Sequence, residues 1–137
     1  QGPLQAPSVF NFFSPGFAPA GEISDRNLVA PELQIATEFL NTSVTNYFYA
    51  QVFNRNSAVT GLADSAIVID ITGEQALIAD ADALVTHIAG KLLGGQISAT
   101  LRAQARAMAE TRPATDVQRV PEALYLIVTS PEFALQR

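Results

Sequence analysis

Residues 80–110, DADALVTHIAGKLLGGQISATLRAQARAMAE, decide the fold, because this stretch contains two amphipathic helices and the turn between them. Asp80 is placed to cap the first helix, whose apolar residues recur every three or four positions up to Leu93. The pair Gly94–Gly95 predicts the end of that helix, and Ser98 is placed to cap the next one. Because short connections make neighbouring helices antiparallel, this stretch predicts a helical hairpin.

The second helix of the hairpin has an apolar side and a charged side. The residues expected to face the core are Ile97, Leu101, Ala105 and Met108, and those expected to face solvent are Arg102, Arg106 and Glu110. Another helix is predicted to begin near Arg119, with Pro121 in its first turn. A final short turn is predicted over residues 131–135, capped by Ser130.

Upstream of the hairpin the pattern predicts one long helix and one extended segment. The helix is expected to begin at Pro31 and to end near Phe53, because apolar residues from Ile35 onward recur at steps of three and four. Residues 66–71, AIVIDI, form the one β-like run, and we expect extended backbone or at most a two-stranded ribbon there. Thr72 and Gln75 resemble a capping box that opens a short helix.

The N-terminal segment, residues 1–23, combines prolines with phenylalanines. Proline fixes extended or turn geometry and phenylalanine favours burial, so we expect a strap pressed on the helical body of residues 24–137. The predicted packing or interaction surface consists of Phe10, Phe12, Phe13 and Phe17. The sequence therefore predicts a single all-α domain. Its expected architecture is about four main helices in an irregular orthogonal or antiparallel bundle, with an extended Pro/Phe-rich strap and at most a minimal β-ribbon.

Composition excludes several functional classes. Of 137 residues, 48% are apolar and 15% are charged, which is typical of a folded chain and not of a disordered one. The net charge of −5 lacks the basic surface that nucleic-acid binding needs, and the absence of cysteine excludes disulfides and thiolate metal sites. The longest stretch without charge, residues 1–21, contains four prolines and three glycines, so we expect no transmembrane segment.

No arrangement of residues points to catalysis. Asp64, Asp70, Glu74, Asp80 and Asp82 are close in sequence but lack the spacing of a calcium loop, and two of them suit the first turn of a helix. His87 is the only histidine and has no metal-ligating or catalytic neighbour at helical spacing. We therefore assign no catalytic residue, no cofactor-binding residue and no metal ligand.

Three stretches resemble a known bacterial family. The opening GPLQAPSVFNFFSPGFAPAGEI with LVAPELQI, the central LGGQISATLR and the ending RVPEALYLIVTSPEFALQR are similar to the C-terminal part of the family catalogued as domain of unknown function 1800. The block PSVFNFFSPGF is the most specific of them. The resemblance implies a long, exported protein in the periplasm or cell envelope, encoded beside an exported sulfatase- or phosphatase-like protein. The family has no established catalytic residues, so the resemblance assigns none to this chain.

From the residues and the resemblance together we expect a non-catalytic C-terminal segment of a longer protein, packing on the remainder of its parent chain or on a partner such as the sulfatase- or phosphatase-like neighbour. One alternative is that Asp64, Asp70, Glu74 or His87 line an enzymatic or carbohydrate-binding site shared with the rest of the parent. The other alternative is a homo-oligomerisation module, since apolar helix faces pair readily across a two-fold axis.

Overall fold

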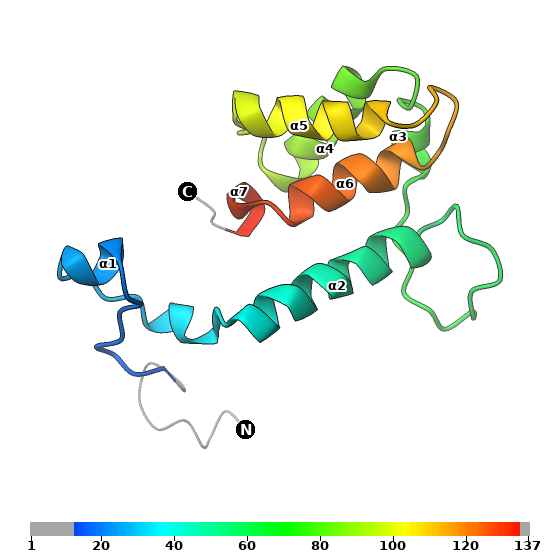
Figure 1. The fold of residues 1–137 in the computed structure, drawn as a ribbon. Coiled ribbons are helices and arrows are strands. Elements are labelled where there is room, and N and C mark those ends of the chain that lie inside the picture. Colours follow the sequence, from blue (N-terminus) through cyan, green and yellow to red (C-terminus); the bar gives the residue numbers. More distant parts are fainter. Residues whose placement is uncertain (1–12, 135–137) are drawn as a thin grey trace. The chain divides into compact units, whose positions relative to one another are not determined.

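The structure, a computed structural model, describes residues 13–134, and the regular elements in that range are all helical (Figure 1). The longer helices are α2 (Glu38–Asn54), α4 (Ala81–Leu92), α5 (Ala99–Glu110) and α6 (Arg119–Val128). The short ones are α1 (Glu22–Asp25), the 3-10 turn η2 (Pro31–Ile35), α3 (Thr72–Gln75) and α7 (Pro131–Ala134). The prediction of an all-α fold with about four main helices is confirmed.

Contacts within the chain divide it between Val44 and Thr45 into two compact units. The first unit contains α1, η2 and the start of α2, and the second contains the end of α2 and α3 to α7. The prediction of one domain with a strap over residues 1–23 stays a prediction. Within residues 13–134, no helix has both the length and the apolar character needed to cross a membrane.

The core of the second unit lies between α4, α5 and α6, which pack on one another (Figure 1). Small and branched apolar side chains fill it, and those with no exposed surface are Leu84, Val85, Ala105, Ala109, Val120, Ala123 and Ile127. The alanines let the helix backbones approach closely, which favours dense packing. One core prediction is wrong: Met108 is 36% exposed, and Ala109 takes the buried position one residue later.

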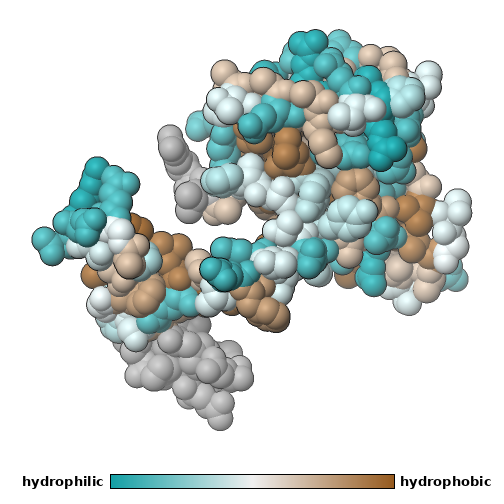
Figure 2. Space-filling model, in the orientation of Figure 1, coloured by the Kyte–Doolittle hydropathy of each residue, from teal (hydrophilic) through white to brown (hydrophobic). Residues whose placement is uncertain are grey.

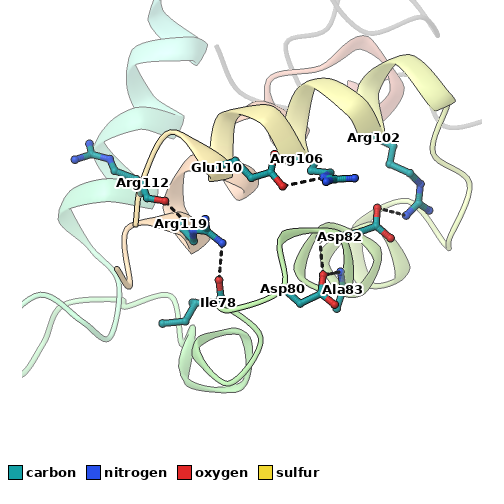
Figure 3. Close-up of polar contacts among 9 residues, drawn as sticks. All are labelled: Ile78, Asp80, Asp82, Ala83, Arg102, Arg106, Glu110, Arg112 and Arg119. Atoms are coloured by element: carbon teal, nitrogen blue, oxygen red, sulfur yellow. Dashed lines mark hydrogen bonds and ion pairs between the residues drawn. The ribbon is translucent and has the colours of Figure 1, made fainter. Parts of the chain in front are cut away.

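Side-chain caps begin α4 and α5 as predicted. Asp80 Oδ1 accepts hydrogen bonds from the backbone N–H groups of Asp82 and Ala83, each at 3.0 Å (Figure 3). Ser98 Oγ accepts one from the backbone N–H of Leu101 at 3.1 Å. Both caps satisfy amide groups that the first turn of a helix leaves without partners, so these two helix starts follow from local sequence.

The predicted helix ends are also confirmed. Gly94 and Gly95 have φ angles of 58° and 81°, a left-handed conformation that residues with a Cβ atom rarely adopt. The N–H of Gly95 donates to the carbonyl of Ala89 at 3.1 Å and closes the last turn of α4. At the other end of the unit, Ser130 Oγ accepts from the N–H of Phe133 at 3.3 Å and caps α7.

The long N-terminal helix does not begin where the sequence predicted. Pro31 opens only the 3-10 turn η2, and α2 begins at Glu38. Thr37 causes the new start, because its Oγ1 accepts a hydrogen bond from the N–H of Leu40 at 3.2 Å. The proline signal was therefore correct for a helical turn, but the threonine cap decides where the α-helix begins.

Two expectations for residues 55–79 have different outcomes. The β-like run is extended and makes a single parallel bridge, between Asn56 and Ile69, in agreement with the minimal ribbon expected. The capping box is wrong, since Thr72 is the first residue of α3 and no side chain caps the preceding position. Instead Asp70 Oδ1 accepts from the N–H of Thr72 at 2.9 Å, which starts the turn two residues earlier.

A buried arginine joins three parts of the second unit. Arg119, only 7% exposed at the start of α6, donates from Nε to the carbonyl of Arg112 at 3.0 Å. Its Nη1 donates to the carbonyl of Ile78 at 2.9 Å, in the turn before α4 (Figure 3). The guanidinium therefore satisfies two backbone carbonyls from separate loops, and charged donors make the stronger hydrogen bonds.

We predict that Arg119→Leu lowers the free energy of unfolding by about 2–4 kcal/mol, because both carbonyls lose their charged donor. Urea denaturation followed by circular dichroism measures this loss. Arg106→Leu is the matched control, since Arg106 forms an exposed ion pair with Glu110 on α5 and its replacement leaves stability nearly unchanged. Equal effects of the two substitutions would contradict the role given to Arg119.

Candidate functional site

The predicted phenylalanine surface is only partly within the described residues. Phe10 and Phe12 lie outside residues 13–134, whereas Phe13 and Phe17 are half-buried in the first unit. The backbone around Phe17 is held, since its carbonyl accepts from the N–H of Ala30 at 2.8 Å. The strap segment that the structure describes is therefore hydrogen-bonded to the chain just before η2.

The first unit exposes large apolar side chains beyond those phenylalanines. Five of them are exposed by half or more, and we call them the N-terminal apolar surface: Leu28 (55%), Val29 (59%), Ile35 (57%), Phe39 (77%) and Val44 (50%). Figure 2 shows hydrophobic residues, in brown, at the surface of this unit. Helix α2 has polar and apolar residues mixed around its circumference instead of one apolar stripe, so packing against a single neighbour would leave apolar side chains in water.

Polar groups gather where α3 meets α4. Glu74 is buried, and its Oε1 accepts a hydrogen bond from Lys91 Nζ at 2.6 Å. The same oxygen lies 3.2 Å from His87 Nε2. The sequence offered His87 no partner on its own helix; the partner comes from α3, 13 residues earlier. Residue spacing within one helix could not reveal this contact.

The carboxylates of this cluster are held in their ionised form. Burial raises the pKa of Glu74, but the hydrogen bond from Lys91 and the positive charge of Lys91 outweigh burial, so the pKa lies below its ordinary 4.5. The pKa of Asp70 is also lowered, chiefly by hydrogen bonds from Thr72. A carboxylate with a lowered pKa is a poor proton donor at neutral pH, so neither residue suits general-acid catalysis.

Asp70 and Glu74 border a small cleft of about 140 Å³, which Ile88 and Val120 also line. Asp64 is exposed, does not line this cleft, and has no side-chain bond within residues 13–134. Oδ1 of Asp82 lies 3.7 Å from Nη1 of Arg102, in an exposed ion pair between α4 and α5 (Figure 3). The five acids singled out in the sequence therefore have different surroundings. Asp70 and Glu74 line the cleft, Asp80 caps α4, Asp82 pairs with Arg102, and Asp64 is an exposed loop residue.

Within residues 13–134, no group of three or more acidic or histidine side chains could hold a metal ion.

A second hollow, of about 380 Å³, was not predicted from the sequence. Its wall is aromatic: Tyr49 and Phe53 come from the end of α2, and Tyr125 comes from α6. Tyr49 and Phe53 are four residues apart, which was a usable local signal for a shared helix face. The third ring is more than 70 positions away in sequence, so only the folded chain brings the three together.

The Glu74 cluster makes stability depend on acid. Because the pKa of Glu74 is lower when folded, its stabilisation is complete above the unfolded value of 4.5 and is lost as pH falls through the folded value. We predict that Glu74→Gln lowers the melting temperature at pH 7 by an amount that shrinks below about pH 4. Asp64→Asn is the control and has little effect at either pH. A melting-temperature difference for Glu74→Gln that stays constant between these pH values would contradict the ion-pair account.

The chain also has a recognisable relationship to other proteins. No curated protein and no solved structure matches it significantly. A family profile, by contrast, matches residues 1–135, nearly the entire chain, and agrees with the resemblance seen in the opening and closing stretches. The chain belongs to the family described as protein of unknown function (DUF1800).

Proposed function

We propose that this chain is a non-catalytic helical segment of an exported bacterial protein, and that its N-terminal apolar surface packs on the remainder of the parent chain. The observation that carries the proposal is the exposure of that surface, led by Phe39 at 77%. Exposed apolar groups of this size, gathered in one unit, are typical of interaction sites. Singly scattered apolar residues would need no such explanation.

Energetics favour a partner in the same polypeptide. Burying a Leu, Ile, Val or Phe side chain contributes roughly 1.5–3 kcal/mol, so five such side chains provide a substantial driving force. A separate partner must also offset the lost translational and rotational freedom, estimated at about 4–15 kcal/mol. A covalently linked partner avoids most of that cost. The parent chain is therefore the occupant we propose, and a sulfatase- or phosphatase-like neighbour is the second choice.

The charged side chains support the non-catalytic part of the proposal. Glu74 is engaged with Lys91, and Glu122 is engaged with Arg112 at 3.0 Å. Both carboxylates are buried. The first ion pair joins α3 to α4, and the second joins the segment that follows α5 to α6. Such pairs stabilise a fold, and each of these two carboxylates is occupied by its own ion pair.

Location outside the cytoplasm, in the periplasm or cell envelope, is part of the same proposal and is supported by the sequence resemblance alone. Fractionation of cells that produce the full-length parent tests it. Recovery in the periplasmic or envelope fraction agrees with the proposal, and recovery with cytoplasmic markers contradicts it.

A calorimetric titration tests the docking proposal. The 137-residue chain is titrated into the separately produced upstream part of the parent, and we expect micromolar or tighter binding. The double variant Phe39→Ser/Val44→Ser should weaken binding by about tenfold or more, because each change removes buried apolar area from the interface. Both side chains are exposed in the chain alone, so the variant keeps its helix content.

Ile67→Ser is the matched control for this titration. Ile67 is 84% exposed but lies in the second unit, outside the N-terminal apolar surface, so its replacement leaves binding unchanged. Absence of binding, or equal weakening by the control, would overturn the proposal. A dimer detected by light scattering and abolished by Phe39→Ser/Val44→Ser would instead favour the homo-oligomerisation alternative.

A further inference from the structure

The aromatic-walled hollow of about 380 Å³ lies wholly within the second unit, and its chemistry points to a ligand of a definite kind. It is bordered by the end of α2, by the segment that follows α5, and by α6. Hollows of this size that combine aromatic walls with a few polar groups are typical small-molecule sites. None of the residues of the N-terminal apolar surface lines it.

The aromatic wall is held rigidly. Tyr49 and Phe53 are stacked, with ring centroids 4.7 Å apart and planes inclined by 29°. Tyr125 meets both rings edge-on, at 5.8 Å from Tyr49 and 5.7 Å from Phe53. Each of these contacts has the offset or edge-to-face geometry that aromatic rings prefer. The three rings therefore fix one another's orientation, and Tyr49, half exposed, keeps ring surface for a ligand.

Polar groups around the wall are available for hydrogen bonding. Tyr49, Asn54, Gln118 and Tyr125 line the hollow. Their hydroxyl and carboxamide groups make no hydrogen bond to any part of residues 13–134. None of these atoms is buried without a partner, so they face water. A carboxamide offers both donors and an acceptor, and a phenol offers one of each. The rim can therefore pair with a ligand rich in hydroxyl groups.

The charges of the hollow balance. Arg112 donates from Nε and Nη2 to the same carboxylate oxygen of Glu122, at 3.2 and 3.0 Å. This pair is the whole complement of charged residues lining the hollow in the part of the chain that the structure describes, so the site is formally neutral. A phosphate-bearing ligand would need a cation that is not already paired, and the chain as a whole carries −5. A neutral ligand fits better than an anionic one.

We propose that this hollow binds a neutral sugar, with the apolar C–H face of one pyranose ring packed on Tyr49 and its hydroxyls bonded to the carboxamides and phenols of the rim. A pyranose has an apolar face and a hydroxyl-bearing edge, which matches a rigid aromatic wall beside uncharged donors and acceptors. The site is a binding site without a catalytic role, and it uses none of the acids that the sequence singled out. It is independent of the docking proposal.

The chain provides its own reporter for this test. It contains no tryptophan and three tyrosines, two of which line the hollow. Tyrosine fluorescence, with saturation-transfer NMR as a second readout, is followed while maltose, cellobiose, mannobiose or diacetylchitobiose is added. We expect at least one of these disaccharides to give saturable binding. Tyr49→Ala should weaken that binding by about tenfold or more, because the stacking surface is lost.

Tyr47→Ala is the matched control, because Tyr47 lies two residues away on the same helix, is 61% exposed and does not line the hollow. It should bind as the unaltered chain does. Gln118→Ala serves as a second variant whose effect on folding is small, and it should weaken binding several-fold. Circular dichroism confirms that each variant is folded.

Three outcomes would overturn the proposal. The first is no saturable binding of any of the four disaccharides up to roughly 50 mM, well above the weakest specific affinities. The second is equal binding by Tyr49→Ala and the unaltered chain. The third is binding of uridine or its monophosphate in place of the disaccharides, which would assign the aromatic wall to a nucleobase.

Discussion

The second unit depends on one constraint: a buried guanidinium must have its N–H groups satisfied, because an unpaired buried charge is strongly destabilising. Nε and Nη1 of Arg119 donate to the carbonyls of Arg112 and Ile78, and these two hydrogen bonds fix the start of α6 against two loops. The same contact holds the backbone of Arg112, whose guanidinium then reaches Glu122. The rim of the aromatic hollow therefore follows from the way the core is closed.

Much of the fold was predictable because its signals are local. Asp80 and Ser98 cap helices through atoms two or three residues away, and the pair Gly94–Gly95 needs only its own φ angles to end one. Predictions of helix starts and of core residues failed where two local sequence signals competed, or where tertiary packing decided which residue is buried. Thr37 overrode Pro31 as the start of α2, and a shift of one residue placed an alanine in the core in place of a methionine. Neither outcome is decided by residue periodicity.

The candidate sites were less predictable, because they join residues distant in sequence. Glu74 and His87 were each recognised as ionisable, yet their contact depends on how α3 packs beside α4. Tyr125 joins Tyr49 only through the approach of α6 to the end of α2. Composition did show that the chain is rich in phenylalanine, and the first unit exposes apolar side chains, of which Phe39 is the most exposed. The kinds of residue at the candidate sites were thus easier to predict than their arrangement in space.

The central claim is that the N-terminal apolar surface is uncovered in this chain and covered in the parent protein. Hydrogen exchange of the α2 residues 38–44, followed by mass spectrometry in both proteins, tests it most directly. The account predicts fast exchange in the 137-residue chain and slow exchange in the full-length parent, while α4 to α6 stay protected in both. Equal exchange of residues 38–44 in the two proteins would contradict it.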